Sequence, residues 1–134
     1  MRKRNLKLKQ YGISAKRYKE LCGFCEQYPE WKEELKEMTN IKSQTISGLP
    51  SGKRGTANVT EDLAIKRQQL LEKCELIEQT AIEADAELYQ YIIKNVCYEL
   101  PYKYLNYIEI PCSRETFYDK RRYFFYLRSK NKKN

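Results

Sequence analysis

Apolar residues recur at steps of three and four in the first third of the chain, which predicts one buried helix face. The stripe consists of Tyr18, Leu21, Cys22, Cys25, Tyr28, Trp31, Leu35 and Met38. Ser14 is a suitable N-cap, because its hydroxyl can accept a hydrogen bond from the first helical turn. Pro29 lacks a backbone N–H, so we expect either a kinked helix or two shorter helices.

A second long helix is predicted from Thr60, a candidate N-cap, through about residue 83. Its seam consists of Leu63, Leu70, Cys74, Ile77, Ala81 and Ala84, and Arg67 interrupts it. Three heptads that contain alanines make a weak zipper between chains, so packing against the first helix is favoured. A coiled coil of two chains stays open as the alternative.

Between these helices, residues 43–60 carry three of the five glycines together with Pro50, and predict a loop. Gly52 to Gly55 includes Lys53 and Arg54, a small basic spot that could touch phosphate. A solvated loop tip is the favoured interpretation. The spacing is not that of a phosphate-binding loop, and no strand precedes it.

The last third of the chain is typical of a helix, a short helix, a turn and a final helix. Asp85 is a candidate N-cap for the first of these, which would bury Leu88, Ile92 and Val96. Pro101 suits the first turn of the short helix, which is expected to bury Tyr104, Leu105 and Ile108. Ser113 would cap the final helix, from Arg114 to about Ser129.

These elements predict an all-α fold, a small helical domain with a long helical hairpin and a C-terminal helix-turn-helix. We expect a basic arm plus a helical segment over residues 1–42 and a linker loop over 43–60. A long helix and the DNA-binding region would follow over 61–134. With 5 Gly and 4 Pro in the chain, a many-turned β-sandwich is disfavoured.

Charge is concentrated at the two ends of the chain. Residues 1–19 hold eight Lys or Arg and no acid, and residues 112–134 hold eight against Glu115 and Asp119. The intervening residues are net acidic, so the chain totals +8. This distribution indicates separate contacts of the two ends with a polyanion. A solubilising role for the N-terminal tail is the alternative.

The chain contains no histidine, which removes His-ligated metal sites and His-based acid–base catalysis. Cys22 and Cys25 match a C-x-x-C pattern, but a zinc site needs two more ligands, so buried thiols are favoured. Glu33, Glu34, Glu83 and Asp85 are expected on solvated faces.

With no nucleophile–base pair, we expect a non-enzyme without a cofactor. We expect it in the bacterial cytoplasm, without membrane contact, because no apolar run could cross a bilayer.

The final helix carries the functional hypothesis. Phe117, Phe124 and Leu127 share one face and should be buried, which would leave Arg114, Glu115, Tyr118 and Arg122 free to meet DNA. Arg114 suits a bidentate pair with guanine, and Glu115 can accept from cytosine N4. The candidate DNA-binding residues are Ser113, Arg114, Glu115, Thr116, Tyr118, Lys120, Arg121, Arg122 and Arg128. Lys120, Arg121 and Arg128 would flank the reading face and meet phosphates.

The stretch from Leu88 to Leu127, ending IPCSRETFYDKRRYFFYL, resembles phage-encoded late transcription regulators of the RinA/ArpU type. The resemblance implies a helix-turn-helix like that of sigma-factor region four. There, the residues matching Arg114, Glu115, Tyr118 and Asp119 face promoter bases. Lys120 stands where the sigma pattern has a buried aliphatic residue, and the turn over 107–112 is longer and contains Pro111.

The leading hypothesis is therefore a phage or prophage transcription regulator that binds double-stranded DNA, with RNA polymerase as a candidate second partner. Whether it forms a homodimer stays open. One alternative is a DNA-packaging subunit of the small-terminase kind, which would form a ring through the long helix. Another is an inhibitor or adaptor that grips an acidic host protein or nucleoprotein complex with the aromatic, basic helix.

Overall fold

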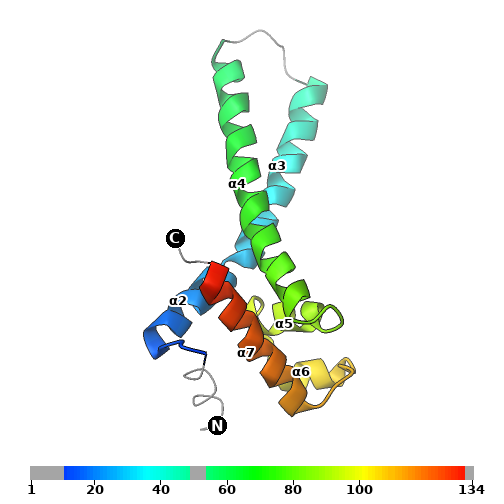
Figure 1. Cartoon of the computed structure of the whole chain (residues 1–134). Coiled ribbons are helices and arrows are strands. Elements are labelled where there is room, and N and C mark those ends of the chain that lie inside the picture. The colour runs from blue at the N-terminus through cyan, green and yellow to red at the C-terminus, as the bar shows by residue number, and fades with distance from the viewer. Residues whose placement is uncertain (1–10, 49–53, 132–134) are drawn as a thin grey trace.

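The computed structural model describes residues 11–48 and 54–131, with side chains over 11–39 and 61–130. All regular structure in these ranges is helical, as the sequence predicts. The helices are α2 (Ala15–Glu26), α3 (Tyr28–Gly48), α4 (Arg54–Ala84), α5 (Tyr89–Val96), α6 (Tyr102–Tyr107) and α7 (Arg114–Asn131). The hairpin of α3 and α4 projects from a body that α2, α5, α6, α7 and the C-terminal half of α4 form (Figure 1).

The first predicted helix is two helices. Ser14 caps α2, because its Oγ accepts a hydrogen bond from the Arg17 N–H at 3.1 Å. Gln27 closes α2. Pro29 then falls in the first turn of α3, where a backbone N–H would have no helical partner. The proline therefore starts a new helix at no cost in hydrogen bonds, and the chain changes direction before it.

The expected loop over 43–60 is too long. α3 continues to Gly48, and α4 begins at Arg54 rather than at Thr60. Each polar residue here costs less than about 1 kcal/mol in a helix, and pairing of two antiparallel helices offsets that cost. Of the expected basic spot, Lys53 lies outside the described residues.

The C-terminal half of α4 forms the centre of the body. It packs against α3, α5 and α7, and confirms the expected contact between the two long helices. The buried seam consists of Leu70, Cys74, Ile77, Ala81 and Ala84. Leu63, in the N-terminal third of α4, is exposed, contrary to expectation.

The chain between α4 and α6 follows the predicted order. Asp85 Oδ1 accepts hydrogen bonds from the N–H groups of Glu87 and Leu88 at 2.8 and 2.9 Å, and α5 begins one residue later. The predicted apolar residues Leu88, Ile92 and Val96 are buried. Pro101 directly precedes α6.

The short helix α6 buries less than expected. Leu105 is fully buried, but Tyr104 is exposed, and so is Tyr107, at 83%. The helix ends in a Schellman turn, in which Ile110 N–H bonds the Leu105 carbonyl and Glu109 N–H bonds the Asn106 carbonyl, both at 3.0 Å. Glu109 has a φ of 63°, in the left-handed region. This turn carries the chain into α7.

Candidate nucleic-acid interface

α7 is held to the body by its aromatic face. Phe117 and Phe124 are fully buried and Leu127 nearly so, as the sequence predicts. Ser113 Oγ accepts a hydrogen bond from the Thr116 N–H at 3.2 Å and thereby caps the helix. Arg114 and Glu115 lie on the exposed side of the first turn.

The Arg114 guanidinium lies near two tyrosine rings. Its Cζ is 5.5 Å from the ring centroid of Tyr102 and 5.4 Å from that of Tyr118. Tyr102 is anchored in turn, because its hydroxyl donates to the Cys112 carbonyl at 3.2 Å and its ring packs on Phe117. Such cation–π contacts reduce the freedom of the arginine before any ligand arrives.

The remaining polar residues of the first turns differ in exposure. Ser113 and Thr116 are exposed and hydrogen-bond each other through their hydroxyls at 3.1 Å. Tyr118 is half-buried. Asp119, which the resemblance leads us to expect at a base-facing position, forms an ion pair with Arg122.

Arg122 does not extend freely from α7, and this expectation is wrong. Its side chain is 8% exposed, and its Nη2 donates to the Asp119 carboxylate. Residues three apart on a helix are neighbours, so this pair forms within α7 itself. Arg122 can reach a ligand only after that pair is rearranged.

Arg128 is not a flanking phosphate contact, because it is buried with 1% of its surface exposed. Its guanidinium lies 4.5 Å from the ring centroid of Phe24 on α2, and its Nε and Nη1 have no hydrogen-bond partner. The helical pattern of α7 alone could not show this, because α2 covers that part of α7 (Figure 1).

Lys120 and Arg121 are both engaged within the protein. Lys120 Nζ lies 3.6 Å from Asp85 Oδ2. Arg121 Nε donates to Asn95 Oδ1 at 2.6 Å, and its guanidinium lies over the Phe125 ring at 5.0 Å. These cations hold α7 on the body, which leaves Arg114 as the most exposed arginine of the predicted set.

Cys25 and Cys97, both buried, share the environment of Arg128. A hydrogen bond from Cys97 lowers the pKa of Cys25, and the charge of Arg128 lowers it further against the effect of burial. The same hydrogen bond raises the pKa of Cys97. Sequence reasoning missed this cluster, because its members lie on α2, just after α5, and on α7.

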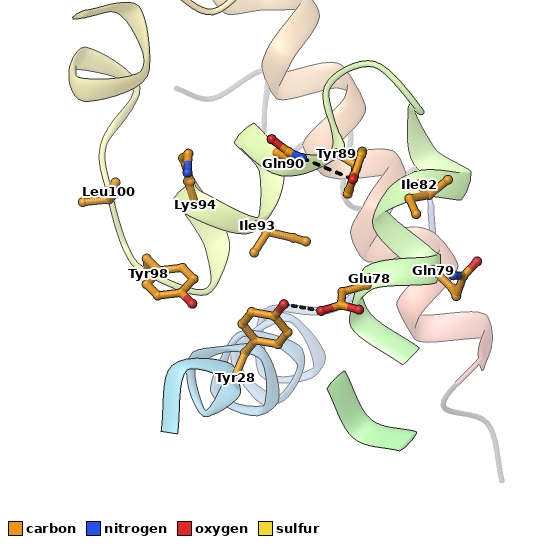
Figure 2. Close-up of a pocket in the computed structure, with 10 residues that line it drawn as sticks. All are labelled: Tyr28, Glu78, Gln79, Ile82, Tyr89, Gln90, Ile93, Lys94, Tyr98 and Leu100. Carbon is orange, nitrogen blue, oxygen red and sulfur yellow. Dashed lines mark hydrogen bonds between the residues drawn. The ribbon is translucent and has the colours of Figure 1, made fainter. Parts of the chain in front are cut away.

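A hollow of about 520 Å³ lies between the start of α3, the C-terminal half of α4, and α5. Figure 2 shows Tyr28 and Glu78 joined by a hydrogen bond at its edge. The Tyr28 hydroxyl donates to the Glu78 carboxylate, whose Oε2 also lies 3.5 Å from Lys32 Nζ. Burial raises the pKa of Tyr28, and Glu78 raises it further. No lining residue belongs to α7, so this hollow is distinct from the candidate interface.

Two further chemistries find no support in the described part of the chain. No three His, Cys, Asp or Glu side chains there gather as a metal site would require. None of the described helices is both long and apolar enough to span a membrane.

Comparison of the chain with protein-family models, with curated proteins and with solved structures gives no match. The functional assignment therefore depends on the geometry of α6, the following turn and α7.

Proposed function

We propose that this protein binds double-stranded DNA and regulates transcription, with the first turns of α7 placed in the major groove. One observation carries the proposal. Arg114 is exposed at the start of a helix whose opposite face is buried, and two tyrosine rings limit where its guanidinium can point. An arginine ordered in this way suits a bidentate pair with guanine O6 and N7.

Neighbouring residues supply the other contacts. Glu115 accepts from cytosine N4, while Ser113, Thr116 and the positive N-terminal end of α7 suit a phosphate oxygen. The helix before a recognition helix usually crosses the DNA backbone. Because Arg128 is buried, we propose that phosphates contact the exposed residues of α6 instead, which are Lys103, Tyr104 and Tyr107.

The resemblance to RinA/ArpU regulators supports a phage or prophage role, with promoter DNA as the target. The order of short helix, turn and capped helix agrees with that resemblance. RNA polymerase remains a proposed second partner.

The test is selection of a binding sequence from random duplexes, followed by affinity measurements on the selected site. Arg114→Ala should weaken binding about five- to a hundredfold and relax the preference at one guanine. Arg114→Lys should keep nonspecific affinity but lose that preference, since lysine lacks the bidentate geometry.

Arg67→Ala is the matched control, because Arg67 is exposed on the hairpin and its loss changes the net charge equally. It should leave the selected sequence unchanged. An Arg114→Ala protein that still selects the same sequence with the same affinity would falsify the assignment of α7 as the reading helix.

A second candidate function is docking on an acidic protein, and the exposed tyrosines favour it. Tyr107 is 83% exposed, and Tyr104 and Tyr98 are also exposed. Folding alone does not require this much exposed aromatic surface. Cosedimentation with purified bacterial RNA polymerase, in the absence of DNA, tests it. Loss of that binding in Tyr107→Ser, with no duplex affinity at low salt, would replace the first proposal with this one.

A further inference from the structure

The fold brings the described parts of the two basic segments together, residues 11–19 and 112–130, although the sequence favours separate contacts. Arg17 of α2 donates from Nε to Ser129 Oγ at 3.1 Å and from Nη2 to the Ser129 carbonyl at 2.9 Å. α2 crosses the C-terminal half of α7, at the end opposite α6 (Figure 1). Arg17 of the N-terminal basic segment thus lies against Ser129 of the C-terminal one.

Three aromatic rings mark that surface, and we call Tyr11, Tyr126 and Tyr123 the tyrosine row. The Tyr11 and Tyr126 centroids are 4.9 Å apart with planes inclined by 30°. Tyr126 and Tyr123 follow at 6.1 Å and 20°. Tyr11 and Tyr123, the outer members, are each 37% exposed, so the row is accessible from solvent at both ends.

A cation contacts the tyrosine row, and two more are exposed on α2, which packs on α7. Lys130 Nζ lies 5.3 Å from the centroid of Tyr126, and Lys16 and Lys19 are exposed on α2. Two acids lie nearby along the helices. Glu20 is 3.8 Å from Arg17, and Asp119 is paired with Arg122, so both already have a cationic neighbour. The sequence adds further lysines and arginines immediately before Tyr11 and after Lys130.

We propose that the tyrosine row binds an unpaired strand of nucleic acid. Bases stack on the outer rings, and the lysines contact the phosphates. Exposed rings beside cations are what strand-binding proteins use, since every base has a flat face and every nucleotide a negative charge. Duplex DNA is a poorer ligand for the row, because its bases already stack on each other and cannot stack on the tyrosine rings. An acidic peptide would use the cations but has no flat groups for the row.

This surface lies in the C-terminal half of α7, whereas Arg114 lies at the helix start. The twelve residues from Arg114 to Tyr126 span about 18 Å at 1.5 Å per residue. The inference goes beyond base reading by the first turns of α7 and holds even if that function fails.

The test is the fluorescence anisotropy of labelled twelve-nucleotide strands, one of deoxythymidine and one of uridine, titrated with the full chain at low salt. Tyr123→Ala should weaken strand binding about five- to a hundredfold, the range for loss of one stacked base. Tyr123→Phe keeps the ring and should bind like the parent. Ile65→Ala removes an exposed apolar side chain from α4, away from both proposed sites, and should have no effect.

Two further arms separate this inference from the proposed function and from a protein partner. Arg114→Ala should bind the strands normally, so a failure of duplex reading alone leaves the strand result intact. The inference is overturned if neither strand binds, or if Tyr123→Ala, still folded by its thermal transition, binds like Tyr123→Phe. It is also overturned if polyglutamate competes as effectively as the unlabelled strand. Binding of either strand supports it, and the preferred sugar identifies the natural ligand as DNA or RNA.

Discussion

At the scale of single residues, Arg128 carries a charge into the interior, and no carboxylate of the described residues pairs with it. Two of its nitrogens have no hydrogen-bond partner, and its neighbours are the Phe24 ring and the Cys25 thiol. Burial lowers the pKa of Arg128, because a charged group loses its hydration there.

We expect Arg128→Met to be as stable as the parent or more stable, by up to about 2 kcal/mol, because an apolar side chain of similar length avoids that loss of hydration. Arg128→Ala should be less stable by about 2 kcal/mol or more, since it leaves a cavity. Urea unfolding followed by circular dichroism measures both. A methionine variant as unstable as the alanine variant would show that the charge itself stabilises the fold.

Glu109 is a residue in an unfavourable backbone conformation. Its φ of 63° costs a non-glycine residue about 1–2 kcal/mol. A glycine at this position would avoid that cost, but it would also lose more conformational freedom on folding, which offsets part of the gain. We expect Glu109→Gly to raise the free energy of unfolding by about 0.5–1 kcal/mol.

Glu83→Gly within α4 provides the control and should lower the free energy of unfolding by about 1 kcal/mol. Thermal melts of the two variants should therefore shift in opposite directions. Equal shifts would mean that the turn before α7 does not impose the left-handed conformation.

At the scale of elements, the Tyr28–Glu78 hydrogen bond ties the start of α3 to α4. Because the pKa of Tyr28 is raised in the folded state, the unfolded chain releases that proton first as the pH increases. The stability from this group is fully present below about pH 10, the pKa of a free tyrosine, and is lost as the pH rises from there through the raised pKa.

Tyr28→Phe should remove one titrating proton from unfolding. Between about pH 8 and 11, the parent should lose about 1.4 kcal/mol more stability than the variant, most of it above pH 10. Urea titrations at pH 8, 10 and 11 measure the difference, and comparison with the parent cancels the other tyrosines and cysteines. Parallel losses in both proteins would contradict the assigned environment of Tyr28.

Local sequence signals predicted the body of this protein better than the hairpin. Ser14 and Ser113 cap α2 and α7 as expected, because capping depends on residues three apart. Asp85 is predicted to cap α5, but it bonds the N–H groups of the turn before that helix, whose N-cap is Leu88. The hairpin differs, because Gly48 and Arg54 are helical through the pairing of α3 with α4, a long-range effect.

In the candidate interface, too, features set by local sequence were predictable, and features set by distant packing were not. Burial of Phe117 and Phe124 follows from their spacing, and so does exposure of Arg114. The positions of Arg128 and Arg121 depend on α2 and α5, which pack on α7 from distant parts of the sequence. No pattern within residues 113–130 contains that information.

At the scale of the whole molecule, several cations are committed to internal contacts, and the salt dependence of binding should reflect this. The logarithm of strand affinity falls with the logarithm of salt by about 0.7 per neutralised phosphate. Lys130→Ala should reduce that slope by about 0.7, because Lys130 lies at the tyrosine row.

Lys120→Ala should leave the slope unchanged, because Lys120 Nζ lies 3.6 Å from Asp85. Affinities measured between low and physiological salt give both slopes. A smaller slope in Lys120→Ala than in Lys130→Ala would place the strand on the other side of α7.

The meeting of Tyr11 with Tyr126 also governs how the protein can be handled in the laboratory. A purification tag fused to Met1 is ten residues from Tyr11, and one fused to Asn134 is eight residues from Tyr126. Moving the tag from one end to the other therefore keeps it close in sequence to the tyrosine row. Binding assays should therefore use protein from which the tag has been cleaved, and an immobilised sample is best attached through a residue of α3.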